Sequence, residues 1–193
     1  PDYNPFDTWT NCYRQIRNMN YFLERASQIK FSNKDELNTI IQHRSKGEAY
    51  FLRAWYQFEL LSRFAGIATN GQLLGFPIVT ASLPQDENIK QARNSFDDCV
   101  KQIYDDIDNS LLYLPKKYDD ANNAELGPTK EGRATMIAAM CLKSRVALYA
   151  ASPLYTVEKN EAEKNKLWES AAQYAMEAIQ LSGTSLPAMK ADF

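Results

Sequence analysis

The sequence predicts an all-α fold made of helical hairpins. Five segments repeat apolar residues at helical spacing, and glycine, proline or asparagine marks most of their ends. The last of these segments carries Ala171, Ala175 and Ala178 at the spacing found in the second helix of a tetratricopeptide repeat. Paired helices of this kind bury their apolar faces by stacking on their neighbours. We therefore expect a tetratricopeptide-like α-α superhelix.

The first two helices are predicted from periodicity and from capping signals. Residues 7–30 form the first, and the second is expected to open at Asn33 with Glu36 three residues later, a capping-box spacing. It continues through Trp55 and stops at Gly66. Gly47 lies inside it and is expected to kink it, because glycine is costly in a helix interior.

The remaining three helices have clearer ends. The third opens at Ser95, with Asp98 at the capping-box offset, and ends before Pro115. The fourth covers residues 135–151 and stops before a proline, and the fifth runs from Asn160, with Glu163 three residues on, to a glycine at 183. We expect one helical domain over residues 1–193, with hairpins at about 34–114 and 133–183.

Two long connections interrupt the repeats, at residues 67–94 and 115–132. Connections of this length are usually functional or contact another element. Their glycines and prolines disfavour continuous helix, so we expect extended surface loops without a helix longer than about three turns. The first contains "GFPIVT", which we interpret as a short edge strand. The strict repeat period of a tetratricopeptide array is absent because these connections are long.

Composition excludes several classes of function. The 193 residues carry a net charge of −2, which gives no broad basic field for nucleic acid or anionic lipid. Cys12, Cys99 and Cys141 lie far apart without a metal-binding spacing, and we expect all three to be buried or partly buried in helices. No apolar run is long enough to span a bilayer. The chain begins at Pro1 rather than Met, so we expect it to be part of a longer protein.

The aromatic stretch at residues 47–66 could be a sugar-stacking platform or a core helix. Its apolar residues cover well over half of a helix circumference, which favours the core. We predict the second helix to be the most buried of the five, with Phe51, Leu52, Trp55 and Phe58 largely inaccessible. Arg53 beside this core needs a partner.

Three aspartates of the third helix could supply that partner. Asp105, Asp106 and Asp108 are the candidates, and Asp106 is preferred because Ile103 and Ile107 flank it at spacings that turn its face inward. The predicted structural ion pair is therefore Arg53 with Asp106. Side chains that extend to water remain an alternative for each of these charges.

Catalytic and metal-binding signals are weak. His43 is the only histidine, which excludes histidine-based triads and multi-histidine metal sites. The three aspartates of "YDDIDN" could suggest calcium, but helical spacing scatters them around the axis. We predict no metal site, no cofactor and no enzymatic activity. Two alternatives stay open, a glycosidase with paired carboxylates in loops and a peptide-binding repeat scaffold.

Several motifs resemble the SusD/RagB family, and they occur in that family's order. "TWTNCYRQIRNMNYFLERA" is similar to its first long helix, "GEAYFLRAWYQFELLSRFAG" to its signature helix, and "GFPIV" to the element that follows. "ARNSFDDCVKQIYDDIDNSLLYLP" and "GRATMIAAMCLKSRVALYAASP" continue the resemblance. The chain is thus identified as resembling surface glycan-binding lipoproteins of Bacteroidota over most of its length.

The resemblance implies a function that the residues alone do not. It implies a non-enzymatic nutrient-binding protein, lipid-anchored in the outer leaflet of the outer membrane, that delivers oligosaccharide to a SusC-like TonB-dependent transporter. The family binds glycans largely with aromatic and polar loop residues, so Tyr3, Phe6 and Trp9 are the candidate ligand contacts. An alternative for these three is a staple that packs the first helix on its neighbours.

Overall fold

Five α-helices dominate the computed structural model, which describes residues 8–83 and 91–183. They are α1 (Thr8–Arg25), α2 (Asp35–Phe64), α3 (Phe96–Leu111), α4 (Met136–Ala150) and α5 (Glu161–Ser182). Single-turn 3₁₀ segments η1 (Ala26–Gln28), η2 (Pro128–Lys130) and η3 (Pro153–Tyr155) lie between them. Strands β1 (Gly66–Ile67) and β2 (Leu73–Leu74) form a small antiparallel hairpin. The all-α prediction is confirmed.

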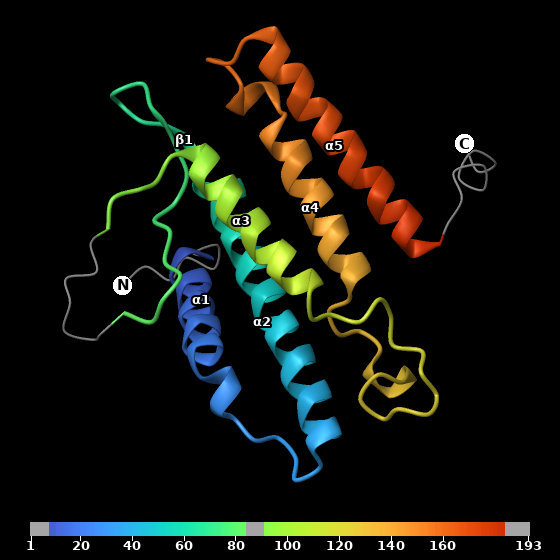
Figure 1. Cartoon of the computed structure of the whole chain (residues 1–193). Helices are drawn as coiled ribbons and strands as arrows, with labels where there is room; N and C mark the ends of the chain where they lie inside the picture. Colours follow the sequence, from blue (N-terminus) through green and yellow to red (C-terminus); the bar gives the residue numbers. More distant parts are fainter. Residues whose placement is uncertain (1–7, 84–90, 184–193) are drawn as a thin grey trace.

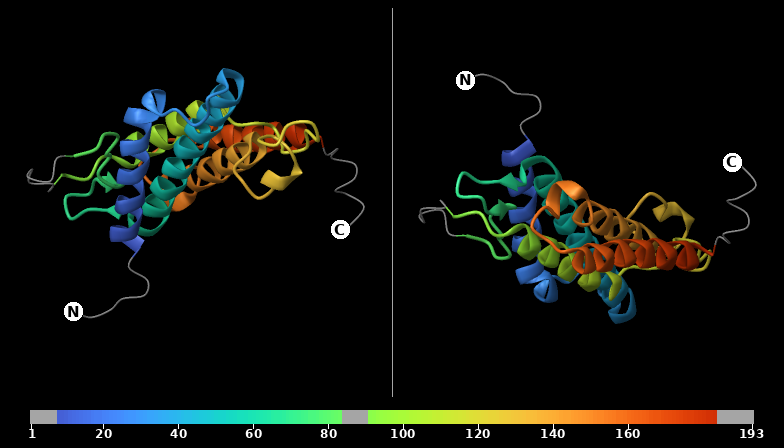
Figure 2. Two further views of the ribbon diagram at one scale, coloured as in Figure 1. Left: turned by 90° about the horizontal axis from the view of Figure 1, so that it is seen from below. Right: turned by 90° about the horizontal axis from the view of Figure 1, so that it is seen from above.

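Consecutive helices lie side by side in one curved row (Figure 1). α2 packs between α1 and α3, and α4 packs between α3 and α5. The views from below and above show that the row twists along its length (Figure 2). The β1–β2 hairpin and the connection after α3 leave the row of helices at opposite ends (Figure 1). This is the stacked hairpin arrangement expected of a tetratricopeptide-like scaffold.

The predicted starts of the last three helices are confirmed by side-chain caps. The Ser95 side chain accepts a hydrogen bond from the Asp98 amide, and Thr135 caps α4 in the same way. Asn160 and Glu163 form a full capping box, and Gly183 ends α5 in the left-handed conformation at φ 79°. These contacts satisfy amide groups that have no partner inside the helix.

The expected cap at Asn33 is wrong. α2 begins at Asp35 after Lys34, which makes no side-chain cap. The Asn38 side chain instead accepts hydrogen bonds from the amides of Phe31 and Ser32, so the preceding turn is held from inside the helix. α1 also ends earlier than expected, at Arg25, because the chain tightens into the 3₁₀ turn η1.

Gly47 does not interrupt α2, which is one continuous helix from Asp35 to Phe64, and the kink expected there stays a prediction. Glycine is required there for packing. A Cβ at this position would lie 2.9 Å from Leu114 Cγ and 3.0 Å from the Leu114 amide nitrogen. The segment after α3 therefore crosses α2 at close range, where only glycine leaves room.

The core forms where α2, α3 and α4 meet, but α2 is not the most buried helix. α3 buries seven of its sixteen residues, whereas α2 buries nine of thirty. Phe58 is 2% exposed as predicted, while Leu52 and Trp55 are each 37% exposed, which contradicts the prediction for those two. The apolar circumference of α2 is wider than the area that α1 and α3 cover. Cys141 of α4 is exposed as well, whereas Cys12 and Cys99 are buried.

Both long connections are loops in the part of the chain that the structure describes. The strand expected at residues 75–80 does not form there. The strand β2 lies just before these residues and pairs Leu73 with Ile67 and Leu74 with Gly66. The connection after α3 is made of turns and the short η2 segment. No described residue of either connection belongs to a helix longer than about three turns, as predicted.

Candidate functional site

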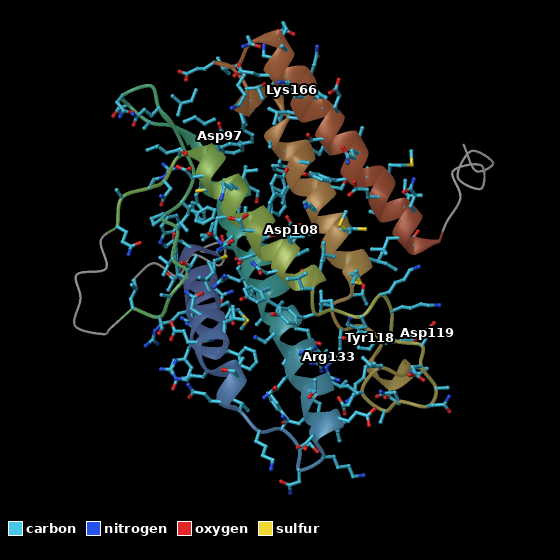
Figure 3. All side chains as sticks on the ribbon, in the orientation of Figure 1. Asp97, Asp108, Tyr118, Asp119, Arg133 and Lys166 are labelled. Carbon is cyan, nitrogen blue, oxygen red and sulfur yellow. The ribbon has the colours of Figure 1, made fainter. Side chains whose placement is uncertain are left out.

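A groove of about 490 Å³ lies at the end of the row where α2 finishes and α3 begins. Three segments far apart in the sequence form its walls: the β1–β2 hairpin, residues 93–97, and residues 154–159. Asp97 marks this end of the molecule, beside the hairpin and at the start of α3 (Figure 3).

The groove has an aromatic floor that is closed to solvent. Phe96 and Tyr155 stack with ring centroids 4.4 Å apart and planes inclined by 18°. Both are buried, at 2% and 7% exposed, so neither ring offers an open stacking face. Ser152 caps η3 and thereby fixes Tyr155, just as Ser95 fixes Phe96 at the start of α3.

Polar side chains line the walls above this floor. Lys159 Nζ donates to Asp97 Oδ2 at 2.7 Å, which ties the segment after η3 to α3. Asp97 is 68% exposed at its side chain, and Gln72 on the opposite wall is also exposed. Carboxylate, ammonium and amide groups on open walls can exchange hydrogen bonds with the hydroxyl groups of a ligand.

Arg93 has a structural role in the groove wall. Its Nε donates to the Gly75 carbonyl at 2.7 Å, and its terminal nitrogen donates to the Leu74 carbonyl at 3.1 Å and to the Phe64 carbonyl. The side chain therefore holds β2 and the end of α2 against the start of α3. The donors on Nε and on this terminal nitrogen are therefore used in shaping the groove.

A buried polar cluster positions the loop that follows the hairpin. Arg53 Nε donates to Asp106 Oδ2 at 2.8 Å, and its second terminal nitrogen donates to Oδ1 at 2.5 Å. Arg53 also donates to Asn20 Oδ1 at 2.8 Å and to the Thr80 carbonyl at 3.3 Å. Asn20 in turn donates to the carbonyls of Val79 and Ala81, each at 3.0 Å. One cluster thus joins α1, α2, α3 and this loop.

The Arg53 and Asp106 side chains lie where sequence reasoning placed them, 8% and 1% exposed. Burial raises the pKa of the Asp106 carboxyl, and the hydrogen bonds from Arg53 oppose that shift. Sequence reasoning missed Asn20 as a member. The only sign in the sequence was that Asn20 is a polar residue on the buried stripe of the first helix, between Ile16 and Ala26.

Trp9 is the one predicted ligand contact that the structure describes, since Tyr3 and Phe6 lie outside the described residues. Its ring packs 5.0 Å from both Tyr13 and Phe64. Tyr13 donates to the Pro77 carbonyl at 2.7 Å, and burial raises the pKa of its hydroxyl. Trp9 is partly buried in this cluster and is not part of the groove lining, so its ligand role stays a prediction.

The carboxylates of α3 do not form a metal site. Asp105 pairs with Lys101 at 3.1 Å, Asp106 with Arg53, and Asp108 with Lys143 at 2.5 Å. Each carboxylate therefore points to a different cation. Among the residues that the structure describes, no group of three or more His, Cys, Asp or Glu could hold a metal ion.

Cysteine thiols and the histidine ring are the remaining candidates for a nucleophile or a base in the described part of the chain. Burial raises the pKa of the Cys12 and Cys99 thiols to about 11, which keeps them protonated near neutral pH. His43 packs its ring 5.5 Å from Tyr113, on α2 and away from the groove. These groups are better explained as parts of the packing than as catalytic residues.

The second connection is clamped to α2 by a separate charge cluster. Arg44 donates to the Glu125 carbonyl at 3.0 Å and to its carboxylate, and Arg133 donates twice to Glu48 at 2.6 and 2.5 Å. Figure 3 shows Arg133 and Tyr118 at this end of the molecule, opposite Asp97. The cluster is distant from the groove and serves to fix the loop.

This clamp predicts a pH dependence of the loop. Burial would raise the pKa of Glu125, but the hydrogen bond and charge of Arg44, together with Lys130, lower it below the ordinary value of 4.5. Stability from a lowered carboxyl pKa is present above the ordinary value and is lost as the pH falls through the lowered one. Hydrogen-exchange protection of residues 120–127 should therefore fall in acid below pH 4.5. In Glu125→Gln that acid loss should be smaller, and an unchanged loss would contradict the assignment.

Comparison with known proteins identifies the family. A family model of SusD-like proteins, described as "Starch-binding associating with outer membrane", matches residues 1–148. The chain belongs to the SusD-like family. No curated protein matched the sequence. Among the described residues, no helix is long and apolar enough to cross a membrane.

Solved structures agree with the SusD-like assignment. A SusD-like protein from Bacteroides fragilis is 27% identical with a TM-score of 0.65, over 91% of this chain and 27% of that one. A SusD superfamily protein from Bacteroides thetaiotaomicron is 25% identical with a TM-score of 0.61, and the match covers 89% of this chain and 31% of that one. A laminarin-binding SusD-like protein shares the fold at 21% identity and a TM-score of 0.64, and the match covers 91% of this chain and 30% of that one. This chain thus spans about a third of the length of these structures.

Proposed function

We propose that this SusD-like chain is the helical part of a non-enzymatic protein that binds oligosaccharides at the cell surface. The observation that carries the proposal is the family match over residues 1–148, whose description names starch binding and the outer membrane. The groove beside Asp97 supports it, because it combines an apolar floor with exposed polar groups on its walls. Its volume suits a small number of sugar units.

A glycan array with the intact protein, followed by calorimetric titration of the best soluble oligosaccharide, tests this function. Asp97→Ala is expected to weaken binding roughly tenfold, because it removes an open-wall acceptor and the anchor of Lys159. Asp119→Ala is the matched control, since this exposed aspartate lies at the opposite end of the molecule (Figure 3). No binding to any glycan on the array, or equal affinity of the two variants, would count against the proposal.

The absence of catalysis is part of the same proposal. Oligosaccharide that the protein binds should be recovered unchanged, because Asp97, one of the two carboxylates that line the groove, is already paired with Lys159. Reducing-end release from the bound sugar during prolonged incubation would instead support a glycosidase. That assay needs only the wild-type protein and the ligand found on the array.

Delivery to a transporter is the further step of the proposal. We propose that the protein is lipid-anchored in the outer leaflet of the outer membrane and passes its ligand to a SusC-like TonB-dependent transporter. The family description supports an association with the outer membrane. Co-expression with the SusC-like transporter of the same organism should give a complex that survives purification. Independent elution of the two proteins would argue against stable delivery.

A further inference from the structure

The hairpin wall of the groove, residues 66–74, has little hydrophobic packing of its own. Each of its strands has two residues, and no residue between 66 and 74 is buried. Ile67 is 61% exposed, and Leu73 packs against the core but stays partly buried. An isolated two-stranded hairpin is at best marginally stable in water. The position of this wall must therefore come mainly from contacts at the base of the hairpin.

The Arg93 guanidinium joins that base to the end of α2. Its hydrogen bonds to the Leu74 and Gly75 carbonyls hold the chain where it leaves β2, and its bond to the Phe64 carbonyl holds the final residue of α2. The last carbonyls of an α-helix have no partner inside the helix, so a side chain can take this one. A planar guanidinium presents its donors at fixed angles, and two of its nitrogens here hold three carbonyls at set distances from one another.

Backbone hydrogen bonds tie the same base to the start of α3. The Gly75 amide donates to the Asn94 carbonyl at 2.9 Å, and the Asn94 amide donates to the Phe76 carbonyl at 3.2 Å. Ser95, the next residue, caps α3, and Asp97 follows in the first turn of that helix. This short segment therefore relates the hairpin wall to the wall that carries Asp97.

We propose that Arg93 is a positioning residue of the groove. It sets the hairpin wall relative to α2 and α3 before a ligand arrives, and the affinity for oligosaccharide depends on that placement. A wall that is fixed in advance spares the ligand the cost of ordering it. The inference rests on the proposed function and adds to it the residue that organises the binding site.

Hydrogen exchange in the ligand-free, intact protein tests the placement itself. The Ala68 amide donates to the Gln72 carbonyl at 2.8 Å within the hairpin, and the Gly75 amide is bonded at its base. Both amides should exchange roughly tenfold faster in Arg93→Ala than in the wild type. The urea midpoint should change little, because Arg93 is exposed and the core is untouched.

Arg93→Lys separates the shape of the guanidinium from its charge. Lysine keeps the positive charge but ends in a single nitrogen on a flexible stem, so it cannot reproduce the contact that two nitrogens make. Amide exchange in this variant should therefore resemble that in Arg93→Ala. Arg63→Ala is the matched control: Arg63 is an exposed arginine at the same end of α2, but it donates to Glu59 within the helix. That change should leave the hairpin amides as they are in the wild type.

Titration with maltooctaose and laminarihexaose measures the effect on binding. For whichever of the two the wild type binds, Arg93→Ala and Arg93→Lys should each weaken the affinity roughly tenfold. Arg63→Ala should bind as the wild type does. Faster amide exchange together with weaker binding supports the positioning role.

The other outcomes separate this inference from the proposed function. Weaker binding with unchanged exchange would mean that Arg93 acts on the ligand directly, which overturns the positioning role. Faster exchange with wild-type affinity, or full rescue of both by Arg93→Lys, would also overturn it and leave the proposed function intact. Failure of the wild type to bind any oligosaccharide would overturn the proposed function and the role of Arg93 in binding, whereas the exchange data would still show whether Arg93 holds the hairpin.

Discussion

Replacing Arg53 with leucine is expected to lower the free energy of unfolding by about 3–5 kcal/mol. The change leaves the Asp106 carboxylate, 1% exposed, without its cation, and it removes the donors to Asn20 Oδ1 and the Thr80 carbonyl. An uncompensated buried charge accounts for most of this loss. Urea denaturation of the intact protein measures it.

The double change Arg53→Leu with Asp106→Leu should cost less than Arg53→Leu alone. Two apolar residues of similar volume no longer strand a buried charge, so the two single effects should not add. Hydrogen exchange at the hydrogen-bonded amides of Ile78 and Ser82 should increase in both variants, because Arg53 and Asn20 hold the carbonyls of the loop between them. Strictly additive losses would mean that the charge pair does not organise the cluster.

Phe58→Ala is expected to be about equally damaging, at about 3–5 kcal/mol. The Phe58 ring is 2% exposed and meets the Tyr149 ring edge-on at a centroid distance of 5.1 Å, which joins α2 to α4. Truncation would leave a cavity where the two hairpins meet, and the surrounding helices can close it only in part. The midpoint of thermal or urea unfolding reports the loss.

Trp55→Ala, one turn away on the same helix, provides the comparison. Because Trp55 is 37% exposed, its truncation should cost only about 1–2 kcal/mol despite the larger side chain. An equal or greater loss for Trp55→Ala would show that the open face of α2 is covered in the intact protein. The order of the two variants therefore distinguishes core from surface on this helix.

The starts of the last three helices could be predicted because contacts within a few residues decide them, and the buried ion pair could be predicted because a buried charge needs a partner. Ser95, Thr135 and Asn160 each supply an oxygen to an amide within three residues, so a short sequence window contains the whole contact. The pairing of Arg53 with Asp106 followed from the need of a buried charge for a partner on the adjacent helix.

The exposed face of α2 could not be predicted in the same way. Aromatic and aliphatic residues surround most of this helix, and only the positions of α1 and α3 determine which of them stay open. Leu52 and Trp55 are consequently exposed while Phe58 is buried, although all three have similar hydrophobic character. Gly47 is a comparable case, because its requirement comes from Leu114, distant in the sequence.

Only the kind of ligand at the candidate site, and not the place of the site, could be predicted from the sequence. Family resemblance indicated glycan binding by loop residues, but the groove is assembled from the hairpin, the start of α3 and the segment after η3, which no sequence spacing relates.

The most direct test of the account is an oligosaccharide titration followed by amide chemical shifts on the intact protein. With maltooctaose or laminarihexaose, whichever binds, we expect shifts at residues 66–74, 93–97 and 154–159, the three segments that wall the groove. Saturable shifts confined to other regions, such as the open face of α2 around Leu52 and Trp55, would contradict the location of the binding surface.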